Sequence, residues 1–235
     1  MRLYTLSNWR RMTEIKFRND VSVELIKSNA IDEDVAHAAW VSNYGGDART
    51  KDTEKMQGLI KYLYREKHMS PFEHGSFTFF IEAPIFVARE FMRHRTMAFN
   101  EWSGRYAELE PVFYVPSDSR PLKQVGKIGN YTFEEGTDDQ MDLVHQQTSR
   151  SYELAWKSYE NMLSCGVAKE VARNVLPVGI YTKFYATVNP RNLMHFLGLR
   201  TAPNALLEIR MVADEMEKLF AQQMPITYSA WDKES

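Results

Sequence analysis

The chain has 235 residues, of which 44% are hydrophobic and 26% charged, and its formal net charge is −2. This length and composition are ordinary for a globular protein and predict a single domain over 1–235. A protein that binds nucleic acid across its surface usually carries a basic excess, which this chain lacks, so any anion-binding site must be a local pocket.

The only cysteine is Cys165, so an intrachain disulfide is excluded and a reducing compartment is indicated. No apolar run reaches the length of a membrane span, and the N-terminal residues place arginine and tryptophan where a secretion signal needs an apolar centre. The sequence therefore predicts a cytoplasmic protein, or one of the host cytoplasm if its source is viral, with no membrane partner.

In the N-terminal half, 42–50 contains two glycines and predicts a mobile loop. Apolar residues spaced by three and four predict a helix in 52–67. Alternating apolar and polar residues predict a half-buried strand over 76–83. Pro84 then precedes 85–95, which predicts a buried helix that ends in arginine, because proline is well tolerated at a first helical position.

In the C-terminal half, 116–137 has no clear period and predicts a long loop that could serve as a lid. A helical period predicts a long helix over 138–164, which ends at Cys165 and Gly166, and another helix over 205–222. Aromatic and β-branched residues predict a strand over 179–188. Pro190 follows it and opens a second helix that ends in arginine.

The segment "RHRTMAFNEWSGRY" runs from Arg93 to Tyr106 directly after an apolar run. If 85–95 is helical, Arg89 shares a face with Arg93, and Glu90 shares one with His94. Buried donors need partners, yet only Glu90 and Glu101 lie nearby for four arginines. This shortfall favours an anionic ligand such as phosphate over a solvated helix end for the arginines Arg89, Arg93, Arg95 and Arg105.

A second strand-to-helix passage, "TVNPRNLMHFLGLR", repeats this composition. Each residue alone is better explained as a salt bridge or a helix cap. Together with Arg173 they predict a pocket for more than one phosphate, and hence for nucleotides; the residues of the passage are Asn189, Arg191, His195 and Arg200.

Several familiar motifs are missing from the chain. There is no glycine-rich Rossmann fingerprint or P-loop, and the six histidines show no zinc-binding spacing, so no metal is predicted. Cys165 follows the C-terminus of a predicted helix, where the helix dipole disfavours a thiolate, which makes it a poor nucleophile.

The segment from Arg93 to Tyr106 resembles the signature of the flavin-dependent thymidylate synthases, in words Arg-His-Arg-x-x-Ser-x-Asn-Glu-x-Ser-x-Arg-Tyr. The chain departs from it at Ala98, where the family has a serine. The blocks 70–89, 168–177 and 181–200 also resemble family segments in the family order. The resemblance begins near Met12, so 1–11 is predicted to be an N-terminal extension.

The resemblance implies an α+β fold, a central and mostly antiparallel sheet flanked by long helices, in a homotetramer. It implies reductive methylation of dUMP to dTMP, with FAD as cofactor and NADPH and methylenetetrahydrofolate as co-substrates. The implied FAD contacts are Ser70, Arg93, His94, Arg95, Glu101, Asn189, Arg191 and His195. The implied dUMP contacts are Glu90, Arg93, Glu101, Trp102, Ser103, Gly104, Arg105, Arg173 and Arg200.

Arg200 is the residue that the family uses to activate the pyrimidine. Arginine stays protonated and cannot act as a base, so Arg200 is expected to stabilise the negative charge that develops as uracil N3 ionises. No protein nucleophile is needed, and Ser103 is expected to bind rather than attack because no His–Asp pair is evident beside it.

Two departures from the family pattern carry expectations of their own. Glu90 stands where the family usually has a glutamine that contacts dUMP, and a carboxylate there would repel a phosphate. Glu90 must therefore pair with an arginine, turn away or be protonated. The hydroxyl missing at Ala98 is expected to reduce affinity by about 1 kcal/mol at most.

Two other classes of protein remain open on the residues alone. One is a nucleic-acid-binding module, with Arg93, His94 and Arg95 on phosphates and Trp102 stacked on a base, which the net charge of −2 disfavours. The other is a nucleotide-binding relative that has lost catalysis, which only Glu90 and Ala98 favour.

Overall fold

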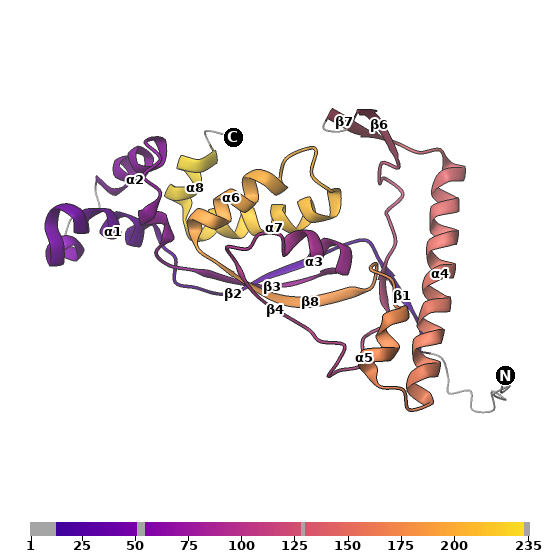
Figure 1. Ribbon diagram of the computed structural model, residues 1–235. Helices are drawn as coiled ribbons and strands as arrows, with labels where there is room; N and C mark the ends of the chain where they lie inside the picture. Colours follow the sequence, from indigo (N-terminus) through magenta and orange to yellow (C-terminus); the bar gives the residue numbers. More distant parts are fainter. Residues whose placement is uncertain (1–12, 51–54, 128–129, 233–235) are drawn as a thin grey trace. The chain divides into compact units, whose positions relative to one another are not determined.

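The computed structural model describes residues 13–50, 55–127 and 130–232 (Figure 1). The chain forms two compact units. Unit 1 contains the described residues of 1–19, 84–86 and 102–181, and unit 2 contains those of 20–83, 87–101 and 182–235. The single domain 1–235 stays a prediction, and the extension 1–11 lies outside the described residues.

Unit 2 is built on a four-stranded sheet with the order β2-β3-β8-β4. β2 pairs antiparallel with β3, and β4 pairs antiparallel with β8. Side-chain pairs between the central strands, Thr78 with Thr187 and Glu82 with Lys183, run in opposite order along β3 and β8, as in an antiparallel pair. The strands are β2 (Ser22–Ser28), β3 (Phe77–Pro84), β4 (Ala98–Glu101) and β8 (Tyr181–Val188).

Helices bury the aromatic residues of this sheet. Phe77 and Phe79 of β3 are fully buried, and the Phe220 ring of α7 packs edge-on against Phe77 with ring centroids 5.9 Å apart. Figure 1 shows α6 and α7 along the sheet. The helices of unit 2 are α1 (Asp32–Tyr44), α2 (Met56–Arg65), α3 (Ile85–Phe91, from Val87 onward), α6 (Pro190–Arg200), α7 (Leu207–Gln223) and α8 (Pro225–Asp232).

A buried carboxylate joins two of these helices. Asp32, the first residue of α1, is 5% exposed. Its Oδ1 accepts hydrogen bonds from the Thr227 N–H (2.8 Å) and hydroxyl (2.6 Å), and its Oδ2 accepts one from the Ile226 N–H (2.9 Å). Asp32 therefore satisfies backbone donors in the first turn of α8, which its own helix cannot satisfy.

Gly75 turns the chain into β3 with φ +87°, in the left-handed region that favours glycine. A Cβ at Gly75 would lie 2.8 Å from the Ala30 Cα, which is backbone and cannot swing aside. We expect Gly75→Ala to lower the free energy of unfolding by about 2–4 kcal/mol, because strain at positive φ and a backbone clash add together.

Gly58→Ala is the matched control for this substitution in urea denaturation. Gly58 lies in α2 and is exposed, and a Cβ added there would have no other atom within 4 Å. Alanine there should be neutral or stabilising by up to about 1 kcal/mol. Equal stabilities of the two variants would contradict a tight turn at Gly75.

Unit 1 has its own core around a long helix. The buried residues Phe113, Trp156, Tyr159 and Ile180 form its centre. β1 and β5 pair in parallel, and β6 and β7 form an antiparallel hairpin. The elements are β1 (Lys16–Arg18), β5 (Val112–Tyr114), β6 (Lys123–Lys127), β7 (Asn130–Glu134), α4 (Asp138–Ser164), α5 (Lys169–Ala172) and the 3₁₀ turn η4 (Arg173–Val175).

The α+β class and the mostly antiparallel central sheet are confirmed, as are the helices expected in 52–67, 138–164 and 205–222. The expected loop over 116–137 is wrong in part, because β6 and β7 lie within it. All of β6 is exposed, so this hairpin has no buried face to impose an alternating pattern.

Two further expectations need correction. The loop expected over 42–50 is the end of α1 followed by the 3₁₀ helix η1 (Gly45–Thr50). The helix expected over 85–95 ends at Phe91. Beyond it the chain turns through tighter bonds, from the Arg93 N–H to the Glu90 carbonyl (3.3 Å) and from the His94 N–H to the Phe91 carbonyl (3.1 Å). Within the described ranges, no helix is long and apolar enough to cross a membrane.

Candidate active site

The segment Arg93–Tyr106 leaves the end of α3, turns, and becomes an edge strand. Residues 98–101 form β4, which pairs with β8 in the register Ala98↔Thr187 to Glu101↔Phe184. The Glu101 carboxylate accepts a hydrogen bond from the Thr182 hydroxyl (2.7 Å). β8 continues through Asn189 into α6, so the second polar passage lies beside the part of the first that ends at Glu101, both in unit 2.

Arg200, the last residue of α6, is held by one acceptor from the last turn of α3 and one from the turn that follows it. Its Nε donates to His94 Nε2 at 2.9 Å, and its Nη1 donates to Glu90 Oε1 in a salt bridge. The side chain of Arg200 is 20% exposed and that of Glu90 is 29% exposed. The group Glu90–Arg200–His94 is therefore partly screened from water. Ion pairs in such a place are stronger than at an open surface.

Glu90 thus takes one of the three states expected for it, because it is paired with an arginine. The shared helical face for Glu90 and His94 is wrong, since α3 ends before His94. The two side chains nevertheless meet at one guanidinium, because the turn at 92–97 brings His94 back over α6. The Phe196 ring contacts His94 from that helix, with centroids 4.8 Å apart.

His94 is a neutral acceptor in this arrangement. Arginine can only donate, so His94 Nε2 must carry a lone pair and its proton must lie on Nδ1. Burial, aided by the nearby charges of Arg200 and His195, lowers the pKa of His94 to about 4. The imidazole is 9% exposed and is uncharged at neutral pH.

We expect the free energy of unfolding to fall as pH drops from about 6.5 to about 4, by up to about 1.4 kcal/mol per pH unit from His94. In this window His94 is protonated in the unfolded chain but stays neutral in the folded protein. Above pH 6.5 the residue adds no pH dependence, and below pH 4 both states are protonated. Denaturant titrations of the wild type and His94→Gln should show a shallower pH dependence in the variant; parallel curves would contradict the assignment.

Three arginines of the first passage present free guanidiniums. Arg89, Arg93 and Arg95 are exposed, and none of them has a side-chain partner among the described residues. The expectation that these donors are buried is therefore wrong. The shortage of counter-charges, however, holds in the structure, because the nearby carboxylates Glu90 and Glu101 serve Arg200 and Thr182 instead.

The second passage is ordered by a helix cap and an ion pair. Asn189 Oδ1 accepts a hydrogen bond from the Asn192 N–H (2.9 Å) and caps α6 at Pro190. Arg191 forms a salt bridge with Glu73, in the 3₁₀ turn η3 (Ser70–Glu73) that begins with Ser70. His195 is exposed, and its ring centroid lies 6.4 Å from that of His94.

The remaining predicted residues lie in unit 1. Gly104 is buried, and a Cβ there would lie 3.2 Å from the Arg173 side chain, so the glycine allows Arg173 to approach closely. Ser103 Oγ accepts a hydrogen bond from the Arg105 N–H (3.2 Å), and the Arg105 side chain pairs with Glu170 at 3.0 Å. Trp102 is half-buried. The unit boundary falls between Glu101 and Trp102, so the structure groups the predicted site residues in two sets.

Sequence reasoning missed the carboxylates that pair with site arginines. Glu73 and Glu170 lie within the family-like blocks 70–89 and 168–177, yet nothing in their spacing marks them as partners of Arg191 and Arg105. Such pairs join residues far apart in the chain. Among the described residues, no group of three His, Cys, Asp or Glu side chains could hold a metal ion.

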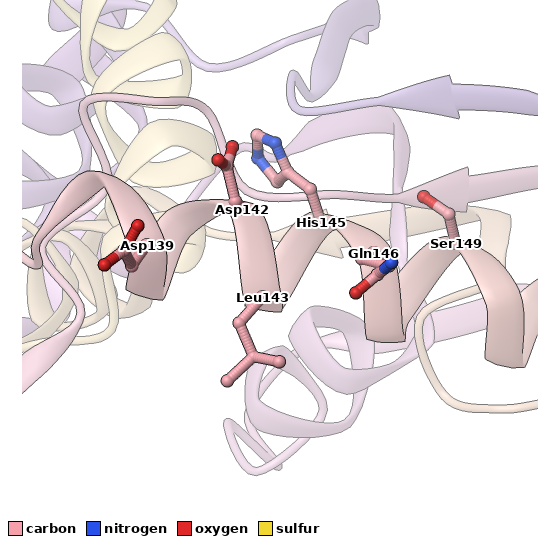
Figure 2. A pocket seen from close by; sticks show the side chains of 6 residues that line it. All are labelled: Asp139, Asp142, Leu143, His145, Gln146 and Ser149. Atoms are coloured by element: carbon pink, nitrogen blue, oxygen red, sulfur yellow. The ribbon is translucent and has the colours of Figure 1, made fainter.

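A hollow on α4 contains none of the predicted site residues (Figure 2). Its lining comes from one helix only, and Asp142 and His145 point away from the side on which Leu143 lies. The side chains do not converge on a common point, so this hollow is a poor candidate for catalysis. The lining residues are Asp139, Asp142, Leu143, His145, Gln146 and Ser149.

A partly screened arginine held by two acceptors, beside further free arginines, is the kind of site found in enzymes that act on phosphorylated substrates. Comparison with known proteins agrees with this class. A family model described as "Thymidylate synthase complementing protein" matches residues 24–226. The chain belongs to the family of flavin-dependent thymidylate synthases.

Individual relatives are similar over nearly their whole length. The flavin-dependent thymidylate synthase of Streptomyces avermitilis is 54% identical over 227 residues, 92% of each chain. That of Streptomyces coelicolor is 52% identical over 230 residues, 93% of this chain and 94% of the relative. A solved structure of the UMP/dUMP methylase PolB from Streptomyces cacaoi bound with 5-Br dUMP is 46% identical, with a TM-score of 0.87 over 93% of this chain and 97% of that one.

Proposed function

We propose that this enzyme catalyses the reductive methylation of dUMP to dTMP, with methylenetetrahydrofolate as the one-carbon donor, NADPH as the reductant and FAD as the cofactor. The observation that carries the proposal is Arg200, fixed by Glu90 and His94 at the end of α6. The names of the relatives support a flavin-dependent reaction. The PolB structures, with brominated UMP and dUMP, support a uracil nucleotide as substrate.

Arg200 acts on the substrate through its charge. A guanidinium cannot remove a proton, but it can stabilise the anion that forms as uracil N3 ionises, which makes the ring a better nucleophile. A cation fixed before the substrate arrives needs no reorganisation in the transition state. The two bonds from Arg200 to the chain support this role, because they restrict a side chain that would otherwise be mobile.

The dUMP phosphate is expected to bind to guanidiniums, which match its geometry. In unit 1, Arg105 directly follows Gly104 in the chain and the Arg173 side chain lies close to Gly104, which supports their assignment to the nucleotide. Trp102, Ser103 and Gly104 of the same segment are proposed to complete the contacts. In unit 2, Arg93 and Glu101 are proposed to contact both dUMP and FAD.

The residues present fit a flavin nucleotide. Arg93 and Arg95 are exposed cations without a counter-ion in the described parts of the chain, as a pyrophosphate ligand requires. We propose that they bind FAD together with Ser70, His94, Glu101, Asn189, Arg191 and His195. When bound, FAD supplies the hydride that NADPH provides. The side chains of the protein bind and orient the ligands and exclude water from the site.

No side chain is proposed as a nucleophile. The Ser103 hydroxyl accepts a hydrogen bond from the Arg105 N–H, and no basic side chain contacts it in the described ranges. Cys165 is exposed at the C-terminal end of α4, where the helix dipole opposes a thiolate.

The direct test adds FAD, NADPH and methylenetetrahydrofolate to the purified protein. The protein should be yellow or become so with FAD, and NADPH oxidation should depend on dUMP. A protein that stays colourless with FAD and shows no dUMP-dependent oxidation of NADPH would contradict the proposal and favour a relative without catalysis. Tight DNA binding at physiological salt would instead favour a nucleic-acid-binding module.

A second candidate reaction is methylation of UMP, because the PolB relative is described as a UMP/dUMP methylase. PolB bound with 5-Br UMP is 45% identical, with a TM-score of 0.85 over 92% of this chain and 96% of that one. Parallel assays with dUMP and UMP at equal concentration distinguish the two substrates by the ratio of kcat/KM.

Self-association to a homotetramer is part of the same proposal. Leu143 and Leu154 of α4 are 56% and 68% exposed and lie eleven residues apart, so they share one face of the helix. Gln147 and Arg150 lie between them on that face, so these two leucines are isolated apolar side chains, and the homotetramer rests on the family resemblance. Native mass spectrometry should give about four times 27.4 kDa. The cytoplasmic location stays a prediction.

A further inference from the structure

We propose that Glu90 is a positioning residue that, with His94, holds the Arg200 guanidinium so that its Nη2 group is left to meet the pyrimidine. The inference rests on the proposed function, and it departs from the expectation that residue 90 contacts the nucleotide. The Glu90 carboxylate would repel the phosphate of dUMP if it were unpaired, yet in this role it supports catalysis.

The Arg200 guanidinium uses only some of its donors within the chain. A guanidinium has five N–H groups. The Nε–H is given to His94 Nε2 and one Nη1–H to Glu90 Oε1. The two N–H groups of Nη2 have no partner among the described residues. Because Nε and Nη1 are both engaged, the planar group cannot rotate about its own axis without breaking a bond.

The negative charge of Glu90 is compensated by the ion pair with Arg200. Its carboxylate is already neutralised by Arg200, so the pair presents little net charge to an incoming dianion. A free carboxylate in contact with the nucleotide would repel both the phosphate and the uracil anion. The arrangement therefore keeps Glu90 beside the arginine and off the substrate, at the cost of some of Arg200's positive field.

The second acceptor comes from the turn that follows α3. His94 is buried against Phe196, and the turn at 92–97 fixes its ring. One carboxylate alone would leave Arg200 free to swing about a single bond. Two acceptors from residues four apart fix its plane as well as its position, so each should matter more to the chemical step than to substrate affinity.

The experiment compares Glu90→Gln, Glu90→Ala and the control Glu215→Gln. Glu215 forms an exposed ion pair with Lys218 on α7, so its variant removes a carboxylate outside the proposed site. We expect Glu90→Ala to lower kcat about 100-fold while the Kd for dUMP, measured by calorimetry, changes less than threefold. Glu90→Gln keeps an acceptor for Nη1 and should stay within about tenfold of the wild-type kcat.

Other patterns would overturn the positioning role. A larger rise in the Kd for dUMP than fall in kcat in Glu90→Ala would make residue 90 a substrate contact. Equal losses in Glu90→Gln and Glu90→Ala would show that the charge itself acts, and unchanged kinetics in both would leave Glu90 without a role. If Glu90→Ala fails to fold, the ratio of kcat to Kd effects in Glu90→Gln still decides.

Crystal structures of the wild type and both variants separate this inference from the proposed function. The Arg200 guanidinium should be ordered in the wild type and in Glu90→Gln, and should move or lose definition in Glu90→Ala. An unmoved Arg200 would contradict the positioning role even if dTMP is made. A wild type that makes no dTMP would contradict the proposed function whatever Arg200 does.

Discussion

Arg200→Ala should lower the rate of dTMP formation by about 10²–10³-fold while the protein remains folded. Removal of one preorganised donor to a developing negative charge has an effect of about this size in other enzymes. Arg200→Lys should restore little, because a single ammonium cannot serve His94, Glu90 and the substrate in the geometry of a guanidinium. Single-turnover measurement of dTMP at saturating dUMP isolates the chemical step.

Arg65→Ala provides the matched loss of a guanidinium. Arg65 lies in α2, pairs with the neighbouring Glu66 at the surface and belongs to neither set of site residues. Its turnover should equal that of the wild type. Near wild-type turnover in Arg200→Ala would remove Arg200 from its role, whereas equal losses in both variants would point to a general effect of charge.

Asp32→Ala should lower the free energy of unfolding by about 3 kcal/mol, an effect comparable to that expected for Gly75→Ala. The buried carboxylate accepts three hydrogen bonds from Ile226 and Thr227. Its removal leaves the first N–H groups of α8 without acceptors in a place that water does not reach easily. Denaturant titration at fixed protein concentration measures the change.

Two variants make the test of Asp32 specific. Asp34→Ala removes the same charge from the first turn of α1, but its side chain has no partner in the described chain, so it should cost about 0.5 kcal/mol. Asp32→Asn should be intermediate, because an amide can accept on one side only. A cost for Asp32→Ala no greater than that of Asp34→Ala would contradict the buried clasp.

Segments with a regular apolar pattern could be predicted from the sequence, although β3 buries Thr78 as well as Phe77 and Phe79 and is therefore more buried than the half-buried strand expected over 76–83. The long helix α4 and the strands β3 and β8 carry their pattern in adjacent residues. The hairpin β6–β7 could not be predicted, since β6 is exposed throughout and its pairing leaves no such pattern. The end of α3 at Phe91 could not be predicted either, because apolar Met92 and polar Arg93 to Arg95 are compatible with a continued helix.

The candidate site divides in a similar way. The signature residues and their spacing indicated the family, and Glu90 was expected to pair with an arginine, turn away or be protonated. The identity of that partner could not be predicted, because Arg200 lies 110 residues away in the chain. Asp32 and Thr227, which lie 195 residues apart, are a second case. Long-range polar pairs depend on how the elements pack, which local pattern does not encode.

Three of the site arginines form ion pairs with carboxylates. Arg200 pairs with Glu90, Arg191 with Glu73, and Arg105 with Glu170. Anionic ligands at these positions must compete with, or add to, an existing ion pair. Rising salt should therefore weaken the binding of an anionic ligand at these paired arginines. The loss of affinity should be less steep than at free arginines such as Arg93 and Arg95.

The most direct test of the central claim is a product analysis. Purified protein with FAD, NADPH, dUMP and methylenetetrahydrofolate carrying a labelled methylene carbon is quenched, and both products are separated. The expected result is labelled dTMP with an equal amount of tetrahydrofolate, since the two electrons that reduce the methylene to a methyl group come from NADPH and not from the folate. Failure to form labelled dTMP, or formation of dihydrofolate without any need for FAD and NADPH, would contradict it.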